Sequence, residues 1–248
     1  MSFNFTVSPS FPNERISDWY IFNTWLQRSL SLPIHLELYD NFGAQRAAIA
    51  AGKVDIIHAN PFDASLLVRE KGFRAIARPE GPPDEMVIVS AAESPAQGIP
   101  DLQPGTRLAC TDDPCVNTVG RILLEPANLD TGNTVELRRE TYIQVAKAIL
   151  RGEADIGFFP VAAFNALSSL VRRDIRVLVT SDTQVIQHVF LVGPALHDRV
   201  DEMTHLLLTM HETDKGRSML EALGASRWQN VQQEDVEFMI DIISTLTQ

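Results

Sequence analysis

The chain has 248 residues, 45% hydrophobic and 21% charged, which is the ordinary composition of a globular protein with one large domain or two small ones. Its formal net charge of -11 argues against a nucleic-acid or anionic-membrane partner, since either would need a basic face. We expect no membrane insertion, because no stretch approaches the ~20 apolar residues that span a bilayer. The first residues have neither the basic start nor the apolar core of a leader. This predicts a cytoplasmic protein, or a periplasmic one if a leader has been removed.

The first third of the chain alternates short strands with helices. We expect strands at Asn4–Val7, Ile34–Leu38, Val54–His58 and Arg74–Arg78. Helices are expected at Ile16–Leu30 and Phe62–Glu70. Polar loops, Ser8–Pro12 and Tyr39–Gly43, follow the first two strands. Strands that alternate with helices predict a largely parallel sheet and the α/β class.

The alternation of strands and helices is interrupted at Glu80–Asp84 and then resumes. Further strands are expected at Glu85–Ser90, Arg107–Cys110, Thr134–Leu137, Ile156–Phe159, Arg176–Thr180 and Gln187–Val192. A helix is expected from about Asn117 to Glu125, and the C-terminal part is predicted helical at Asp198–Glu212, Lys215–Leu223 and Glu234–Thr247.

One pattern occurs twice. Ala48–Ile57 and Ala148–Gly157 align without a gap, each with an Ala-rich segment, a helix-closing Gly, an Asp and a β-prone run. The matched glycines are Gly52 and Gly152. Two long-spaced copies predict two similar lobes, because repeat arrays need three or more units.

We therefore predict two α/β lobes, each with a mixed, mostly parallel sheet flanked by helices. Residues 1–84 with 191–248 form lobe 1, and 92–182 form lobe 2. Segments 85–91 and 183–190 are expected to be the strands that cross between the lobes.

Several motifs resemble the phosphonate/phosphate-type substrate-binding proteins of ABC transporters. They are Gly52–Ile56, Asn60–Phe62, Leu102–Arg107, Asp113-Pro114 with Gly120, and Gly152–Gly157. The resemblance covers nearly the whole chain. It implies a type 2 periplasmic-binding-protein fold, a two-lobed clamshell that closes around a small ligand.

The chain departs from the family at positions that read the ligand. The family's S-T-S run falls at Asn117–Val119, and a family histidine falls at Tyr142. A family aromatic falls at Ala64, and an acidic position falls at Phe159 or Pro160. These changes predict a pocket that is less charged and less selective for anions.

Ligand contacts are expected where strands end and helices begin. Asn60, Asp113 and Thr141 also suit helix N-caps, which is the competing interpretation for each alone. The predicted ligand-binding residues are Ser8, Ser10, Tyr39, Asn41, Phe42, Asn60, Asp63, Asp112, Cys115, Asn117, Thr118, Thr141, Tyr142, Phe158 and Phe159.

Other reactive residues are assigned structural roles. Asp55 and Asp155 each follow a helix-closing Gly and are expected to accept backbone N–H groups within the turn. Cys110 and Cys115 are expected to be buried and inert, with metal or redox use as the alternative. His58, in the first repeat strand, and His188 are interpreted as core histidines. We expect no cofactor, metal or catalytic residue.

The predicted function is a small-molecule binding protein, a cytosolic sensor or adaptor that acts with a regulator. An ABC transporter component working with a permease is one alternative. A second is a cytosolic lyase or synthase of the menaquinone- or thiamine-pathway type on the same fold. A third is a module that has lost its ligand and acts through protein contacts.

Overall fold

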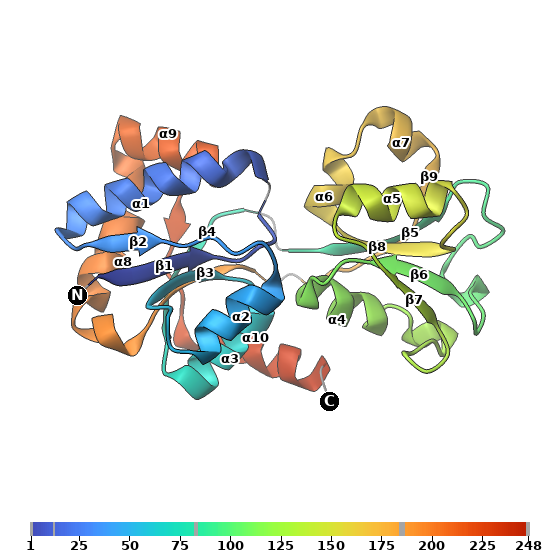
Figure 1. Ribbon diagram of the computed structural model, residues 1–248, viewed down its shortest axis with the longest axis horizontal. Helices are drawn as coiled ribbons and strands as arrows, with labels where there is room; N and C mark the ends of the chain where they lie inside the picture. Colours follow the sequence, from blue (N-terminus) through green and yellow to red (C-terminus); the bar gives the residue numbers. More distant parts are fainter. Residues whose placement is uncertain (1, 12, 82–83, 184–186, 247–248) are drawn as a thin grey trace. The chain divides into compact units, whose positions relative to one another are not determined.

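The computed structural model describes residues 2–11, 13–81, 84–183 and 187–246, and the chain forms two compact units. The first combines Met1–Pro82 with Gln187–Thr245, and the second combines Pro83–Ile186 with Leu246–Gln248. Each unit is one sheet flanked by helices (Figure 1). The predicted two-unit α/β fold class is confirmed.

The sheet of the first unit has the strand order β11-β4-β10-β3-β1-β2. Strands β1, β2 and β3 pair in parallel, whereas β10 runs antiparallel to both of its neighbours, β3 and β4. The strands are β1 (Phe3–Val7), β2 (Ile34–Leu36), β3 (Ile56–Ala59), β4 (Arg74–Pro79), β10 (Val189–Val192) and β11 (Trp228–Gln229). The helices are α1 (Ile16–Leu30), α2 (Phe42–Ala50), α3 (Pro61–Lys71), α8 (Val200–Leu208), α9 (Asp214–Leu223) and α10 (Gln233–Leu246).

The sheet of the second unit has the strand order β7-β6-β8-β5-β9. Here β6, β7 and β8 pair in parallel, and β5 runs antiparallel to β8 and β9. The strands are β5 (Met86–Ala91), β6 (Arg107–Cys110), β7 (Val135–Arg138), β8 (Ile156–Pro160) and β9 (Ile175–Thr180). The helices are α4 (Pro114–Ile122), α5 (Tyr142–Leu150), α6 (Val161–Ala166) and α7 (Ser169–Arg173).

The two sheets share one topology. The order β7-β6-β8-β5-β9 repeats β2-β1-β3-β10-β4, strand for strand, and the reversed strand holds the same place in both. This confirms the predicted duplication. The assignment of segments 85–91 and 183–190 to interlobe crossings stays a prediction, and residues 184–186 lie outside the described part. So do Pro12 of the first predicted loop, residues 82–83 of the predicted break and Thr247 of the last predicted helix.

The repeated helix-turn-strand has the predicted local structure. Gly52 and Gly152 adopt φ of 67° and 68°, the left-handed region that glycine tolerates best. After each glycine, the next residue donates its N–H to the carbonyl of the matched alanine, Ala48 or Ala148, at 3.0 and 2.9 Å. These bonds satisfy carbonyls at the helix end.

The hydrogen-bond donors predicted for Asp55 and Asp155 are wrong. Each carboxylate accepts a backbone N–H from the neighbouring strand rather than from its own turn. Asp55 binds the N–H of Asn4, and Asp155 binds the N–H of Arg107, both at 2.8 Å. The reason is that each Asp directly precedes a strand that pairs with β1 or β6, so an N–H from far along the sequence lies closest.

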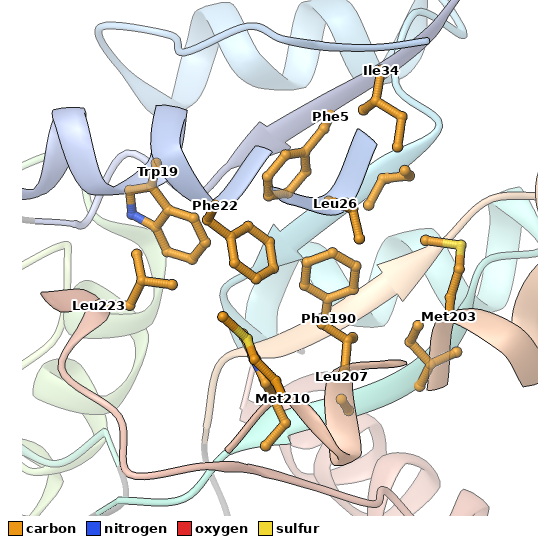
Figure 2. Close-up of a cluster of buried hydrophobic side chains, with 14 of the residues drawn as sticks. Phe5, Trp19, Phe22, Leu26, Ile34, Phe190, Met203, Leu207, Met210 and Leu223 are labelled. Atoms are coloured by element: carbon orange, nitrogen blue, oxygen red, sulfur yellow. The ribbon is translucent and has the colours of Figure 1, made fainter. Parts of the chain in front are cut away.

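The core of the first unit lies on both faces of its sheet. Strand residues alternate between the faces, as a period of two requires. Phe190 and Val192 pack with α1, α8 and α9, whereas Val189 and Leu191 pack with α2, α3 and α10. Figure 2 shows the first of these clusters, in which Phe190 lies near Phe5 and Phe22.

Several predicted boundaries are wrong. Strand β3 begins at Ile56 rather than Val54, and α4 begins at Pro114 rather than near Asn117, because Asp113 caps it. The predicted helix Asp198–Glu212 is divided into two 3₁₀ turns, 194–199 and 210–212, with α8 between them. The short strand β11 was not predicted.

Candidate functional site

The parallel strands of the first unit bring Ser8 and Asn60 together. Ser8 follows β1 and Asn60 follows β3, and these two strands pair. Asn60 donates from Nδ2 to Ser8 Oγ at 3.0 Å, and each residue is 1% exposed. Two predicted site residues from distant parts of the sequence therefore share a hydrogen bond.

A partly buried ion pair lies next to this contact. Asn60 caps α3 by accepting the N–H of Asp63 at 2.9 Å and donates from Nδ2 to Asp63 Oδ2 at 2.6 Å. Asp63 is 0% exposed, and its Oδ1 accepts from Arg46 Nε at 2.6 Å. The Arg46 guanidinium also lies 4.8 Å from the centre of the Phe62 ring, a cation–π geometry.

Sequence reasoning found Asp63 but missed Arg46 and Gln45, which lie on α2. Gln45 is fully buried and donates from Nε2 to Thr6 Oγ1 at 3.1 Å and to the carbonyl of Val7 at 2.8 Å. The only local signal was the presence of two long polar side chains in an Ala-rich helix.

Ser10 connects the site to a pair of histidines. Its Oγ lies 3.2 Å from Ser8 Oγ and 2.9 Å from Nε2 of His188. His188 stacks on His58, with centroids 5.3 Å apart and planes at 19°. The rings of Trp19 and Trp228 also lie near His58, with centroids at 5.2 and 5.8 Å. Burial, and then the nearby His188, lower the pKa of His58 well below its usual range.

Acidification is expected to destabilise the first unit through His58. Since its folded pKa is depressed, the unfolded chain takes up the proton first, and stability falls as pH drops below about 6.5. One proton contributes a slope of up to about 1.4 kcal/mol per pH unit. Urea unfolding between about pH 7.5 and pH 5 measures the slope. His58→Gln should reduce this slope, and the control variant His205→Gln, at an exposed position, should not. Equal slopes in wild type and His58→Gln would contradict the assignment of the pH dependence to His58.

The predicted residues after β2 lie at the start of α2 and beside it, and their contact with a ligand stays a prediction. Asn41 is exposed and caps α2, accepting the N–H of Ala44 at 2.8 Å. Phe42 is buried at 5% exposure, and half-buried Tyr39 packs on the cluster beneath α2 and α3. Burial, with Glu37 nearby, raises the pKa of Tyr39.

In the second unit, the N-terminus of α4 is occupied by its own cap. Asp113 Oδ1 accepts the N–H groups of Cys115 and Val116, at 3.0 and 3.3 Å. Tyr142 donates its hydroxyl to Asp113 Oδ2 at 3.2 Å. Burial, followed by the charge of Asp113, raises the pKa of Tyr142 well above its usual range, so its hydroxyl stays a donor.

The carbonyl of Thr111, beside this cap, accepts two hydrogen bonds. Asn117 donates from Nδ2 at 2.9 Å, and Arg138, which sequence reasoning missed, donates from Nη1. Asn117 Oδ1 is buried and has no hydrogen-bond partner among the described residues.

The remaining polar residues predicted in this unit lie nearer the solvent. Thr118 is half-buried, and Asp112 and Thr141 are exposed. Thr141 caps α5 by accepting the N–H of Gln144 at 3.2 Å. All three predicted caps, Asn60, Asp113 and Thr141, are confirmed.

Phe158 and Phe159 belong to the core of the second unit. Phe159 is 0% exposed and packs with Tyr142 and Phe164, at centroid distances of 5.6 and 6.2 Å. Phe158 is 1% exposed and faces Gly120 of α4. Both rings are packed against the protein in the core of the second unit, and their predicted contact with a ligand stays a prediction.

Gly120→Ala is expected to destabilise the second unit by about 1–2 kcal/mol. The added Cβ would lie 2.6 Å from ring carbons of Phe158, and such overpacking outweighs the roughly 1 kcal/mol gained in helix propensity. Scanning calorimetry measures the effect. Gly98→Ala is the control, because its Cβ would meet only Pro100 at 3.6 Å. Equal melting temperatures for the two variants would contradict the packing.

The cysteines lie in the core as expected. Cys110 is 0% exposed and Cys115 is 4% exposed. Burial raises the pKa of the Cys110 thiol to about 11, so it stays protonated at neutral pH.

Comparisons with known proteins agree with this architecture. XAC2383 from Xanthomonas citri, bound to chloride, is 13% identical, with a TM-score of 0.82 and coverage of 99% of this chain and 98% of that one. PhnD1 from Prochlorococcus marinus, in complex with methylphosphonate, is 11% identical with the same TM-score and coverage. The aliphatic sulphonate binding protein SsuA from Escherichia coli is 14% identical, with a TM-score of 0.66 and coverage of 99% and 91%. These likenesses show the fold.

None of the curated proteins compared with the chain matches it. Within the described residues, no helix is long and apolar enough to cross a membrane. A family model described as "ABC transporter, phosphonate, periplasmic substrate-binding protein" matches residues 5–236. The chain therefore belongs to the family of phosphonate-type periplasmic substrate-binding proteins of ABC transporters.

Proposed function

We propose that this chain is a non-catalytic binding protein whose two units close on one small molecule. The observation that carries the proposal is the family match across residues 5–236. The duplicated sheets support it, since each presents capped, polar loops at the carboxyl ends of its parallel strands, where α/β proteins bind ligands. Ligand binding then shifts an equilibrium between open and closed forms.

The ligand-binding site of this chain selects dianions less strongly than the name of a phosphonate-binding protein implies. A helix N-terminus attracts anions through its unpaired N–H groups. At α4, the Asp113 carboxylate already accepts the N–H groups of Cys115 and Val116. A second negative charge there would meet repulsion from Asp113. The polar contacts proposed for the ligand come from Ser8, Ser10, Asn60, Asn117, Thr118 and Tyr142.

The biological setting follows from the partner. The family description and the names PhnD1 and SsuA favour a transporter component that delivers its ligand to a permease. The role of a cytosolic sensor or adaptor, acting on a regulator, stays a prediction. Fractionation of the native host cells separates the two, because a transport component must lie outside the cytoplasmic membrane.

A thermal-shift screen tests the proposed function. The panel contains methylphosphonate, ethanesulfonate, β-alanine and acetate, at a pH where methylphosphonate is a dianion. A ligand at a hundred times its Kd stabilises the folded chain by about 2.7 kcal/mol. We expect a singly charged or zwitterionic compound to give the largest shift. The largest shift from methylphosphonate would contradict the altered pocket, and no shift from any compound would count against the binding function.

A further inference from the structure

Arg46 lies beside the polar residues of the first unit and uses only some of its hydrogen-bond donors. Its Nε donates to Asp63 at 2.6 Å, and its face rests on Phe62. The side chain is 34% exposed. Its Nη2 is buried, and no described residue offers it a hydrogen-bond acceptor. The guanidinium is thus held in a fixed orientation with donor capacity to spare.

Asp63 does not supply the missing acceptor in this structure. Its Oδ1 binds Arg46 Nε, and its Oδ2 binds Asn60 Nδ2 at 2.6 Å. A buried donor without a partner costs about 1–3 kcal/mol, and more for a charged group. Native proteins usually give such a donor a partner, which is a protein group, an ordered water, an ion or a bound molecule.

The charges around Arg46 limit what could bind it. The pair of Arg46 with the fully buried Asp63 is neutral as a unit. It therefore offers directional donors without a net positive field, which suits one planar oxyanion better than a dianion. A carboxylate matches the fork of a guanidinium and can accept two parallel N–H bonds.

We propose that Arg46 is a specificity-determining residue that binds a carboxylate group of the ligand through its Nη atoms. This assignment rests on the proposed binding function and narrows its ligand to carboxylate-bearing molecules. Asp63 and Phe62 act as positioning residues, because they hold the plane of the guanidinium.

Side-chain NMR of arginine in the full-length protein tests the assignment. Acetate and methylphosphonate are titrated separately while the Arg46 Nε–H resonance, identified by its loss in Arg46→Lys, is followed. We expect acetate to shift this resonance with a Kd on the order of millimolar. Methylphosphonate should bind at least about tenfold more weakly, a difference of about 1.4 kcal/mol. An unmoved resonance at about 100 mM acetate, or tighter binding of methylphosphonate, would overturn the proposal.

Variants separate this proposal from the broader function. Arg46→Lys keeps the charge beside Asp63 but lacks the fork, and it should weaken acetate binding about tenfold. Arg28→Met removes an exposed arginine of α1 and should change nothing. If a compound from the thermal screen binds wild type and Arg46→Lys with the same affinity, the proposed role of Arg46 is wrong, whereas the proposed binding function is supported. If no compound stabilises the protein and the Arg46 resonance does not move, both the role of Arg46 and the binding function are contradicted.

Discussion

Phe190→Ala is expected to lower the free energy of unfolding of the first unit by about 3–5 kcal/mol, the usual cost of truncating a buried Phe. Phe190 is 0% exposed on β10, between β3 and β4. Its ring lies 5.5, 6.1 and 5.7 Å from the rings of Phe5, Phe22 and Trp228. Removing it opens a cavity that aromatic neighbours on separate elements cannot refill together.

Tryptophan fluorescence in urea isolates this effect. The chain has three tryptophans, Trp19, Trp25 and Trp228, all in the first unit, so their signal reports the unfolding of that unit. Phe238→Ala is the matched control, because Phe238 is 56% exposed and should cost much less. A loss below about 1 kcal/mol in Phe190→Ala would show that this core is not packed as described.

Arg46→Met is expected to cost about 2–4 kcal/mol, near the lower end for a broken buried ion pair because Arg46 is partly exposed. The variant leaves the Asp63 carboxylate fully buried, with Asn60 as its remaining side-chain donor among the bonds described. Adding Asp63→Asn removes the stranded charge, so the double variant should recover much of the loss.

A double-mutant cycle measured by urea unfolding gives the coupling between the two residues. We expect a coupling of about 1–3 kcal/mol between Arg46 and Asp63. Arg28→Met, at an exposed position of α1, should lie within about 0.5 kcal/mol of wild type. Additive effects of Arg46→Met and Asp63→Asn would contradict a buried pair.

Local signals in the sequence predicted most of the fold. The helix Ile16–Leu30 has the predicted bounds because its apolar period is uninterrupted. Gly52 and Gly152 mark helix ends because the left-handed cap is a property of one residue type. Asn60 and Asp113 mark helix starts for a similar reason, since each precedes a proline that suits the first helical position.

Contacts between distant segments were beyond such signals. Asp55 binds Asn4 and Arg46 binds Asp63 only because the sheet and its helices bring separate segments together. The strand β11 is two residues long, too short for a period to be visible, and it exists through its pairing with Pro79 and Arg78. The burial of Phe158 and Phe159 was beyond the sequence pattern, because a ring at the end of a repeat strand can face either a core or a ligand.

Small-angle X-ray scattering of the protein, with and without a compound found in the thermal screen, tests whether the two units close on one molecule. We expect a saturating concentration of the compound to lower the radius of gyration, because two units that share a ligand spend more time closed. An unchanged radius of gyration, with the compound demonstrably bound, would contradict closure of two units on one molecule.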